Sequence, residues 1–368
     1  MLEATIIPTM ASTTDQPTVM GPVPLPFNNA IAAGDVPAVD PGLLEEYESI
    51  ISSLPSNPKM HLNCYQGAWV QRTWVPGIIA IQRGHFTPRH GDVVLVSPPK
   101  CGTTWLKALA FATMARRVHP PPPAAAAAAA ADVDAQQHPL LRLNPHDCVP
   151  FMEKLFAAGL GSRMDALPSP RLMATHMHHS LLPTSISDNP DCKIIYICRD
   201  PKDMLVSMWQ FARRILPELQ FYNVFELACE GRCLSGPIWD HILGYWNASK
   251  TSPENVLFLR YEEMLQYPND NVRKLAQFVG QPFSPDEEEA GVVMDIVRLC
   301  SFEKMKNLKV NEADSSPIQV PRNTTFANDS FFRRGGAGDW TNHMTPEMAG
   351  RLDAIMNEKL HGTGISFS

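Results

Sequence analysis

Residues 93–107 have the sequence VVLVSPPKCGTTWLK, and the order of residue types along this stretch decides the fold. The apolar run 93–96 predicts a buried strand, and a short turn with Lys100 and Gly102 follows it. The next residues predict a helix. Strand, turn and helix N-terminus together make an anion site, because unpaired N–H groups and the helix dipole point at the same place. The stretch therefore predicts a phosphate cradle, to which Lys100 adds a positive charge.

This cradle is not a Walker A loop, which has the pattern G-x-x-x-x-G-K-[ST] with the lysine after the last glycine. Here Lys100 precedes Gly102, and no glycine lies four to six residues upstream. An ATP-dependent P-loop kinase is therefore an alternative that the residue order disfavours. Binding of ATP with Mg²⁺ would distinguish that alternative.

Composition limits the class of protein. The chain has 368 residues, of which 44% are hydrophobic and 19% charged, as is typical of a soluble globular protein. Its net charge of −7 does not favour nucleic acid as a partner, so any anion site must be local. No apolar run approaches the roughly 20 residues that span a bilayer, so no membrane partner is expected.

The N-terminal residues and the cysteines indicate the compartment. Acidic residues precede the first basic residue, Lys59, so we predict no targeting signal and a cytoplasmic protein. The eight cysteines are scattered along a long chain, which predicts free thiols. Cys229 and Cys233 lack a second pair of ligands, so no metal site is predicted there.

Low-complexity segments set the expected domain boundaries. Residues 1–45 are predicted to be a disordered tail, because Pro, Ala, Thr and Gly dominate most of this segment without a period. Residues 46–368 are predicted to be a single domain. A Pro- and Ala-rich stretch at 119–137 is predicted to be a surface insertion in that domain.

The rest of the chain alternates short apolar runs with helical patterns, which predicts an α/β fold with a central parallel sheet flanked by helices. Lys100, His176, Arg199 and Tyr261 each follow one predicted strand. Ligands of such sheets bind outside the carboxyl ends of the strands, so these four residues are expected to share one site. The predicted strands are 93–96, 171–175, 193–198 and 256–259, and the predicted helices lie near 102–117, 201–213, 237–249, 262–280, 286–298 and 345–359.

Two further segments carry groups that suit an anionic ligand. Residues 193–209 place Arg199 at the end of a strand and Ser207 two turns into a helix, and guanidinium matches phosphate. The alternatives are a surface ion network of Arg199 with nearby aspartates or a Walker B strand ending at Asp200. Residues 331–343 place Arg333 and Arg334 before a glycine-rich turn, which predicts either an anion clamp or a basic surface loop.

Residues 171–183 contain the candidate base. His176 follows a predicted strand, and histidine can take a proton from a hydroxyl near neutral pH. A structural role is the alternative, since a histidine after a strand is more often structural. A metal site with His178 and His179 is disfavoured because no carboxylate or cysteine accompanies them.

Together the four segments resemble the cytosolic sulfotransferases, in particular their plant branch, which use 3′-phosphoadenosine 5′-phosphosulfate (PAPS). The resemblance runs from about residue 65 to the end, in the family's order and spacing. It implies a P-loop-like three-layer fold and transfer of a sulfuryl group to a hydroxyl of a small organic acceptor. Flavonoids, steroids and hydroxylated hormones are the acceptor types that the family suggests.

The resemblance also implies residue roles. His176 corresponds to the general base and Lys100 to the lysine that stabilises the leaving group, and no metal is required. The chain departs from the animal dimer motif near its end, which predicts a monomer or a weak homodimer. The residues that correspond to the PAPS site are Lys100, Cys101, Gly102, Thr103, Thr104, Trp105, Arg199, Ser207, Tyr261, Ser301, Arg333, Arg334 and Gly335.

Departures from the family pattern keep one more hypothesis open. Cys101 replaces a serine of the loop, and Met177 with His178 replaces Leu-Pro after the base. A homologue that binds the nucleotide without turnover is therefore an alternative. Cys101 also lies beside a lysine and a helix N-terminus, which predicts a lowered pKa of its thiol and sensitivity to oxidation.

Overall fold

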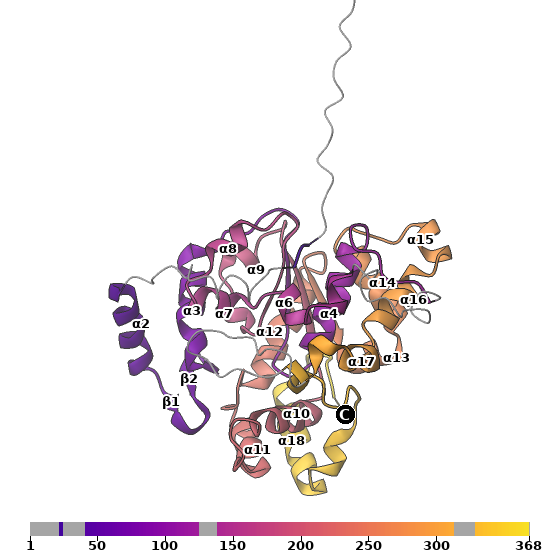
Figure 1. Ribbon diagram of the computed structural model, residues 1–368. Coiled ribbons are helices and arrows are strands. Elements are labelled where there is room, and N and C mark those ends of the chain that lie inside the picture. The colour runs from indigo at the N-terminus through magenta and orange to yellow at the C-terminus, as the bar shows by residue number, and fades with distance from the viewer. Residues whose placement is uncertain (1–21, 25–40, 125–137, 313–327, 368) are drawn as a thin grey trace, which may run out of the picture.

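The computed structural model describes residues 22–24, 41–124, 138–312 and 328–367. Its centre is a four-stranded parallel sheet with the order β5-β4-β6-β7, and a small antiparallel sheet with the order β1-β2-β3 lies beside it (Figure 1). The parallel strands are β4 (Val93–Val96), β5 (Leu172–Thr175), β6 (Lys193–Cys198) and β7 (Val256–Arg260). The antiparallel strands are β1 (Ser56–Asn57), β2 (Leu62–Tyr65) and β3 (Ala68–Gln71).

Helices cover both faces of the parallel sheet, which confirms the predicted layered α/β fold. Alternate residues of β4 enter two hydrophobic clusters, because successive side chains of a strand point to opposite faces. Val94 and Val96 belong to one cluster, and Val93 and Leu95 belong to the other. The helices are α2 (Pro41–Ser53), α3 (Val75–Ala80), α4 (Thr103–Ala115), α6 (Pro145–Cys148), α7 (Met152–Ala157), α8 (Ser162–Asp165), α9 (Thr184–Ser187), α10 (Pro201–Ala212), α11 (Phe221–Cys229), α12 (Ile238–Thr251), α13 (Tyr261–Gln266), α14 (Pro268–Phe278), α15 (Pro285–Glu289), α16 (Val292–Leu299), α17 (Phe302–Lys306) and α18 (Pro346–Lys359).

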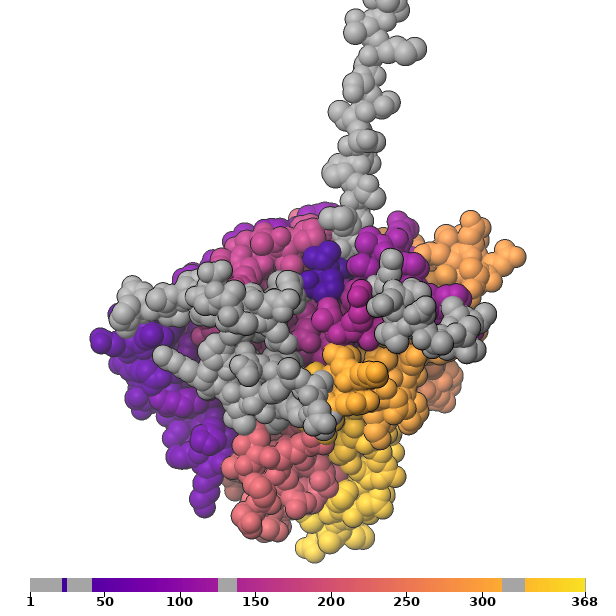
Figure 2. Space-filling view, viewed as in Figure 1, coloured from indigo at the N-terminus to yellow at the C-terminus, as the bar shows by residue number. Residues whose placement is uncertain are grey.

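The outer elements lie at opposite sides of the molecule. In the space-filling view the N-terminal elements around α2 and β1–β3, in indigo to purple, form one side, and α15, in orange, projects from the other (Figure 2). Among the described residues no helix is both long and apolar enough to cross a bilayer. The eight cysteines all carry free thiols, as predicted.

Two of the predicted helices are wrong in extent. The helix predicted over 262–280 is divided into α13 and α14, because Pro268 begins a new helix and cannot continue the preceding one. The helix predicted over 286–298 is divided into α15 and α16 at Gly291, whose φ of +74° lies in the left-handed region. The four predicted strands agree with the structure to within one residue at each end.

The boundaries of the predicted tail and insertion stay predictions. Helix α2 begins at Pro41, within the last residues of the predicted tail 1–45. Most of the tail lies outside the described residues, as do residues 125–137 of the predicted insertion.

A buried ion pair ties together the starts of two central strands. Asp92 precedes β4 and Arg171 precedes β5, and neither side chain is exposed. The Arg171 guanidinium donates to both carboxylate oxygens of Asp92, at 3.0 Å from Nε and 2.5 Å from Nη2. The backbone N–H of Arg89 also donates to Asp92, at 2.7 Å. The pair therefore fixes the register of β4 against β5 at the amino ends of the strands.

Replacing Asp92 by alanine is expected to lower the free energy of unfolding by about 3–5 kcal/mol, because the Arg171 guanidinium is then buried without its counter-charge. Denaturation by urea at neutral pH measures this loss. The matched control is Glu48→Ala, which breaks an exposed ion pair with Arg72 and is expected to change stability far less. Equal effects of the two substitutions would contradict the prediction.

Candidate active site

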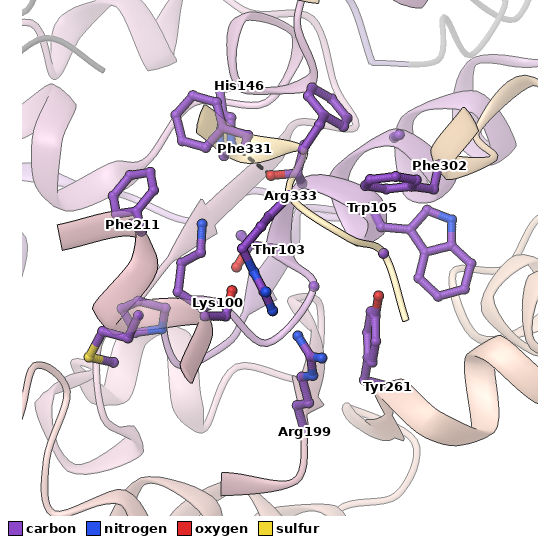
Figure 3. A pocket seen from close by; sticks show the side chains of 18 of the residues that line it. Lys100, Thr103, Trp105, His146, Arg199, Phe211, Tyr261, Phe302, Phe331 and Arg333 are labelled. Carbon is purple, nitrogen blue, oxygen red and sulfur yellow. Dashed lines mark hydrogen bonds between the residues drawn. The ribbon is translucent and has the colours of Figure 1, made fainter. Parts of the chain in front are cut away.

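One cavity lies at the carboxyl ends of the parallel strands and collects residues from all four of the predicted segments (Figure 3). Lys100 follows β4, His176 follows β5 and Arg199 follows β6. Tyr261 follows β7, and Arg333 enters from the C-terminal segment. Strands that run parallel end at the same edge, and this is why residues far apart in the sequence meet there.

The phosphate cradle has the predicted strand–turn–helix form. The Ser97 and Thr103 hydroxyls are 2.6 Å apart and close the turn between β4 and α4. Gly102 has a φ of +97°, and a Cβ at this position would lie 2.6 Å from the Tyr261 ring. Only glycine therefore fits both the backbone conformation and the close approach of Tyr261. The first N–H groups of α4 have no acceptor within the helix and are available to an anion.

Lys100 is held in a strongly positive part of the cavity. Its backbone has a φ of +70°, and its ammonium nitrogen lies 3.9 Å from the centre of the Phe211 ring. Burial and the charges of Arg333, Arg214 and Arg199 lower the pKa of Lys100 to about 7. An anionic ligand in the cradle would reverse the effect of these neighbouring charges.

Arg199 belongs to a buried network. Its Nη2 donates to the carbonyl oxygen of Gly336 at 2.6 Å and lies 3.5 Å from Asp203 Oδ2. Its guanidinium carbon lies 4.7 Å from the centre of the Tyr261 ring, and Nε is buried without a protein partner among the described residues. Arg199 therefore does pair with Asp203, as the alternative of an ion network predicted, but the side chain is 7% exposed, so this pair is buried and not on the surface. Asp200 caps α10 by accepting from the Lys202 N–H at 2.8 Å.

The glycine-rich segment is clamped against α10. Asp203 accepts from the backbone N–H groups of Gly338, at 2.6 Å, and Trp340, at 3.0 Å. Both Arg333 and Arg334 pair with Asp339, and hydrogen bonds from Arg333 and Asn342 outweigh burial and lower the pKa of this carboxyl to about 2.

Within this segment, Gly335 packs directly against the ring of Phe302. Its φ is +69°, and a Cβ there would lie 2.4 Å from the Phe302 ring. The segment therefore brings two guanidinium groups to the rim of the cavity on a backbone that the protein itself holds in place.

His176 has the geometry of a base. Its Nδ1 lies 2.7 Å from the carbonyl oxygen of Ser97, which can only accept, so Nδ1 carries the proton and Nε2 has the free lone pair. The ring stacks on Trp74 at 5.5 Å and contacts Phe151 at 4.5 Å, both measured between centroids. Burial lowers the pKa of His176 to about 3, so the imidazole is neutral at pH 7. Its backbone N–H donates to Glu153 at 2.9 Å.

His178 does not compete with His176. The Nε2 of His178 lies 3.0 Å from the carbonyl oxygen of Ser235, and the side chain is buried outside the residues that line the cavity. Within the described parts of the chain, no three histidine, cysteine, aspartate or glutamate side chains are arranged to hold a metal ion.

Comparison with known proteins identifies the family. A profile described as "Sulfotransferase domain" matches residues 90–364. The chain is a member of the sulfotransferase family. Cytosolic sulfotransferase 8 of Arabidopsis thaliana is 40% identical to it over 87% of this chain and 93% of the relative.

Solved structures agree with this assignment. An Arabidopsis thaliana sulphotransferase structure has a TM-score of 0.68 and 34% identity, covering 91% of this chain and all of that one. The mouse sulfotransferase SULT7A1 complexed with PAP has a TM-score of 0.59 and 26% identity, over 82% of this chain and 95% of the other. The protein is thus a sulfotransferase of the plant cytosolic type, as predicted, and its curated relatives are named cytosolic sulfotransferases.

Most of the predicted site residues of this sulfotransferase line the cavity, but two do not. Ser301 caps α17 by accepting from the Lys304 N–H at 3.3 Å, while its neighbours Cys300 and Phe302 line the cavity. Cys101 is buried behind the loop, and its N–H donates to Pro98 at 3.3 Å. The predicted residues that do line the cavity are Lys100, Gly102, Thr103, Thr104, Trp105, His176, Arg199, Ser207, Tyr261, Arg333, Arg334 and Gly335.

The expected redox sensitivity of Cys101 is wrong. Burial in the core raises the pKa of its thiol far above the usual value, and the nearby charge of Arg199 does not compensate. The thiol side chain packs in the hydrophobic cluster beneath the loop, so it is neither ionised nor open to a reagent.

His146 is a cavity residue that the sequence analysis did not assign. Its Nδ1 lies 3.1 Å from Lys107 Nζ, and its Nε2 lies 3.0 Å from the Thr104 hydroxyl. The imidazole therefore links the Thr104 hydroxyl, in the first turn of α4, to the Lys107 side chain. His146 lies on the four-residue helix α6, where no periodicity marks its position.

Replacing His146 by phenylalanine is expected to weaken the binding of PAP, the 3′,5′-adenosine bisphosphate, about 3- to 10-fold, because Thr104 loses the bond that orients its hydroxyl. Calorimetric titration with PAP measures the change. The exposed His361→Phe serves as the control and is expected to bind as the wild type does. Unchanged affinity in the His146 variant would show that Thr104 needs no such partner.

Proposed function

We propose that this sulfotransferase transfers the sulfuryl group of PAPS to a hydroxyl of a small organic acceptor, with His176 as the general base. The observation that carries the proposal is the meeting of three features in one cavity. These are the cradle around Lys100, the arginine groups around Arg199 and a buried neutral imidazole with its Nε2 lone pair free. A nucleotide with phosphates at two ends and a hydroxylated acceptor match these features.

The nucleotide would be held by residues of different segments. The N–H groups at the start of α4 and Lys100 suit the 5′-phosphate, because they concentrate positive charge at one point. Arg199, Ser207 and Arg333 suit the 3′-phosphate, and the guanidinium groups offer paired donors. Trp105 packs edge-on against Tyr261 with 5.7 Å between ring centroids and suits the base.

The reaction is an in-line displacement at sulfur. The acceptor oxygen forms a bond to sulfur as the bond between sulfur and the bridging phosphate oxygen breaks. His176 Nε2 takes the hydroxyl proton, and PAP leaves with the bond electrons on its phosphate oxygen. Lys100 stabilises the charge that develops on that oxygen, which lowers the energy of the transition state.

The acceptor end of the cavity is largely apolar. Gln71 and Trp74 come from the region of the antiparallel sheet, and Phe151, Met208 and Leu234 come from three later segments. Apolar walls with a few polar groups suit a flavonoid, a steroid or a hydroxylated hormone.

Transfer from PAPS to a panel of phenols and alcohols tests the proposal, alongside calorimetric titration with PAP and with ATP–Mg²⁺. Binding of PAP together with sulfation of at least one acceptor supports it. Binding of PAP without turnover of any acceptor would indicate the inactive homologue. Binding of ATP–Mg²⁺ in preference to PAP would overturn the proposal altogether.

A further inference from the structure

Lys154 places an ammonium group beside the proposed base. Helix α7 carries it to the wall of the cavity, where its Nζ lies 4.8 Å from the centre of the Phe151 ring and 5.8 Å from that of Trp74. These two rings are the ones that contact the His176 imidazole. Three lysine charges lower the pKa of His176, and the charge of Lys154 has the largest effect of the three. Lys154 therefore lies at the acceptor end of the cavity.

Lys154 makes no hydrogen bond or ion pair among the residues that the structure describes, and the one opposite charge that acts on it is that of its neighbour Glu153. Lys107, which also lies over the Phe151 ring, differs from Lys154 in its hydrogen bonds. Its Nζ donates to the Val149 carbonyl oxygen at 2.7 Å and to His146 at 3.1 Å, so it is satisfied within the protein.

The adjacent carboxylate is engaged elsewhere. Glu153 accepts from the backbone N–H of His176 at 2.9 Å and is fully buried at the end of β5. Burial lowers the pKa of Lys154, and Glu153 opposes this change only in part. The side chain of Lys154 is half-buried in the cavity wall, and a negative group of a ligand placed there would form a charge-assisted bond with its ammonium.

We propose that Lys154 selects an acceptor that bears a carboxylate in addition to the hydroxyl that receives the sulfuryl group. The inference rests on the proposed sulfuryl transfer and narrows its acceptor to a hydroxylated carboxylic acid. In the proposed function the phosphates of the nucleotide have Lys100, Arg199 and Arg333 as partners, so Lys154 remains for the acceptor. The rings of Trp74 and Phe151 suit the hydrocarbon part of such an acid.

The test compares hydroxy acids with their methyl esters as acceptors, on aliphatic, alicyclic and phenolic scaffolds. In the wild type at least one acid is expected to have a kcat/KM roughly 10- to 100-fold above that of its ester, because a bond to a charged group is stronger. Lys154→Met is expected to remove this preference, mainly by raising KM for the acid. Lys154→Arg keeps the charge and is expected to retain it.

Two outcomes would overturn the inference. One is the absence of any acid in the panel that is preferred to its ester. The other is an equal loss of kcat/KM for acid and ester in Lys154→Met. That result would indicate that the ammonium contacts the transferred sulfuryl group and not a carboxylate of the acceptor. Lys154→Glu adds a reversal, since the acid is then expected to be the poorer member of the pair.

Titration with PAP separates this inference from the proposed function. Lys154→Met is expected to bind PAP as tightly as the wild type, which also shows that the variant is folded. If the wild type itself fails to bind PAP, the proposed function fails. If PAP binds and esters are sulfated but acids are not preferred, the carboxylate inference alone fails.

Discussion

Replacing His176 by asparagine is expected to lower kcat by about 10²- to 10⁴-fold, because the acceptor hydroxyl then lacks the group that takes its proton. Asparagine can still donate to the carbonyl oxygen of Ser97, so the cavity keeps its shape. Turnover of PAPS at saturating acceptor measures the loss. Affinity for PAP is expected to change little, since the imidazole faces the acceptor.

The ionisation of His176 offers an independent check. Burial lowers its pKa from the usual 6.5 to about 3, and a lowered pKa means that the neutral form, which is the base, persists down to acid pH. In ligand-free protein its NMR ring signals are therefore expected not to shift between pH 8 and 5. Titration of His176 near pH 6.5 would show a solvated ring.

Replacing Lys100 by methionine is expected to lower kcat by about 10²- to 10³-fold, because the bridging oxygen of the donor loses the charge that stabilises it as it leaves. Binding of PAP is also expected to weaken, since Lys100 points into the cradle beside Phe211 (Figure 3). The matched control is Lys274→Met, an exposed residue of α14. Full activity in the Lys100 variant would contradict its role.

Proton uptake tests the state of Lys100 before it binds a ligand. Its pKa is lowered to about 7, so at pH 8 most of the ligand-free protein carries a neutral amine. An anion in the cradle raises this pKa, and binding of PAP at pH 8 therefore draws in a fraction of a proton. Calorimetry in two buffers with different ionisation enthalpies measures it. The uptake is expected to vanish at pH 6 and in the Lys100→Met variant.

The pattern of apolar residues along the chain predicted the strands whose ends form the site. The apolar runs of β4 and β6 are long enough and buried enough that hydrophobicity alone marks them. The residues that follow those strands, Lys100 and Arg199, meet in the cavity because parallel strands share an edge. Short elements were not predicted. The strand β1 has two residues and α6 has four, too few for any period to be read.

The interpretation of single residues failed where burial decides the chemistry. Cys101 is next to Lys100 in the sequence, which suggested a reactive thiol, but the turn sends the two side chains to opposite sides of the loop. Ser301 matches a family position, yet its hydroxyl caps α17. In both cases the direction of the side chain is set by backbone turns that neighbouring residue types do not reveal.

The sequence by itself determined the alternation of strands and helices, the strand–turn–helix cradle and the family, because these depend on residue types within short windows. Only the tertiary structure decided the proton position on His176, the partners of His146 and the place of Lys154 in the cavity wall beside His176. Each of these depends on atoms from distant segments, such as the carbonyl oxygen of Ser97. Hydrogen bonding and burial act over a few ångströms in space, and only the packed chain defines which groups lie within that reach.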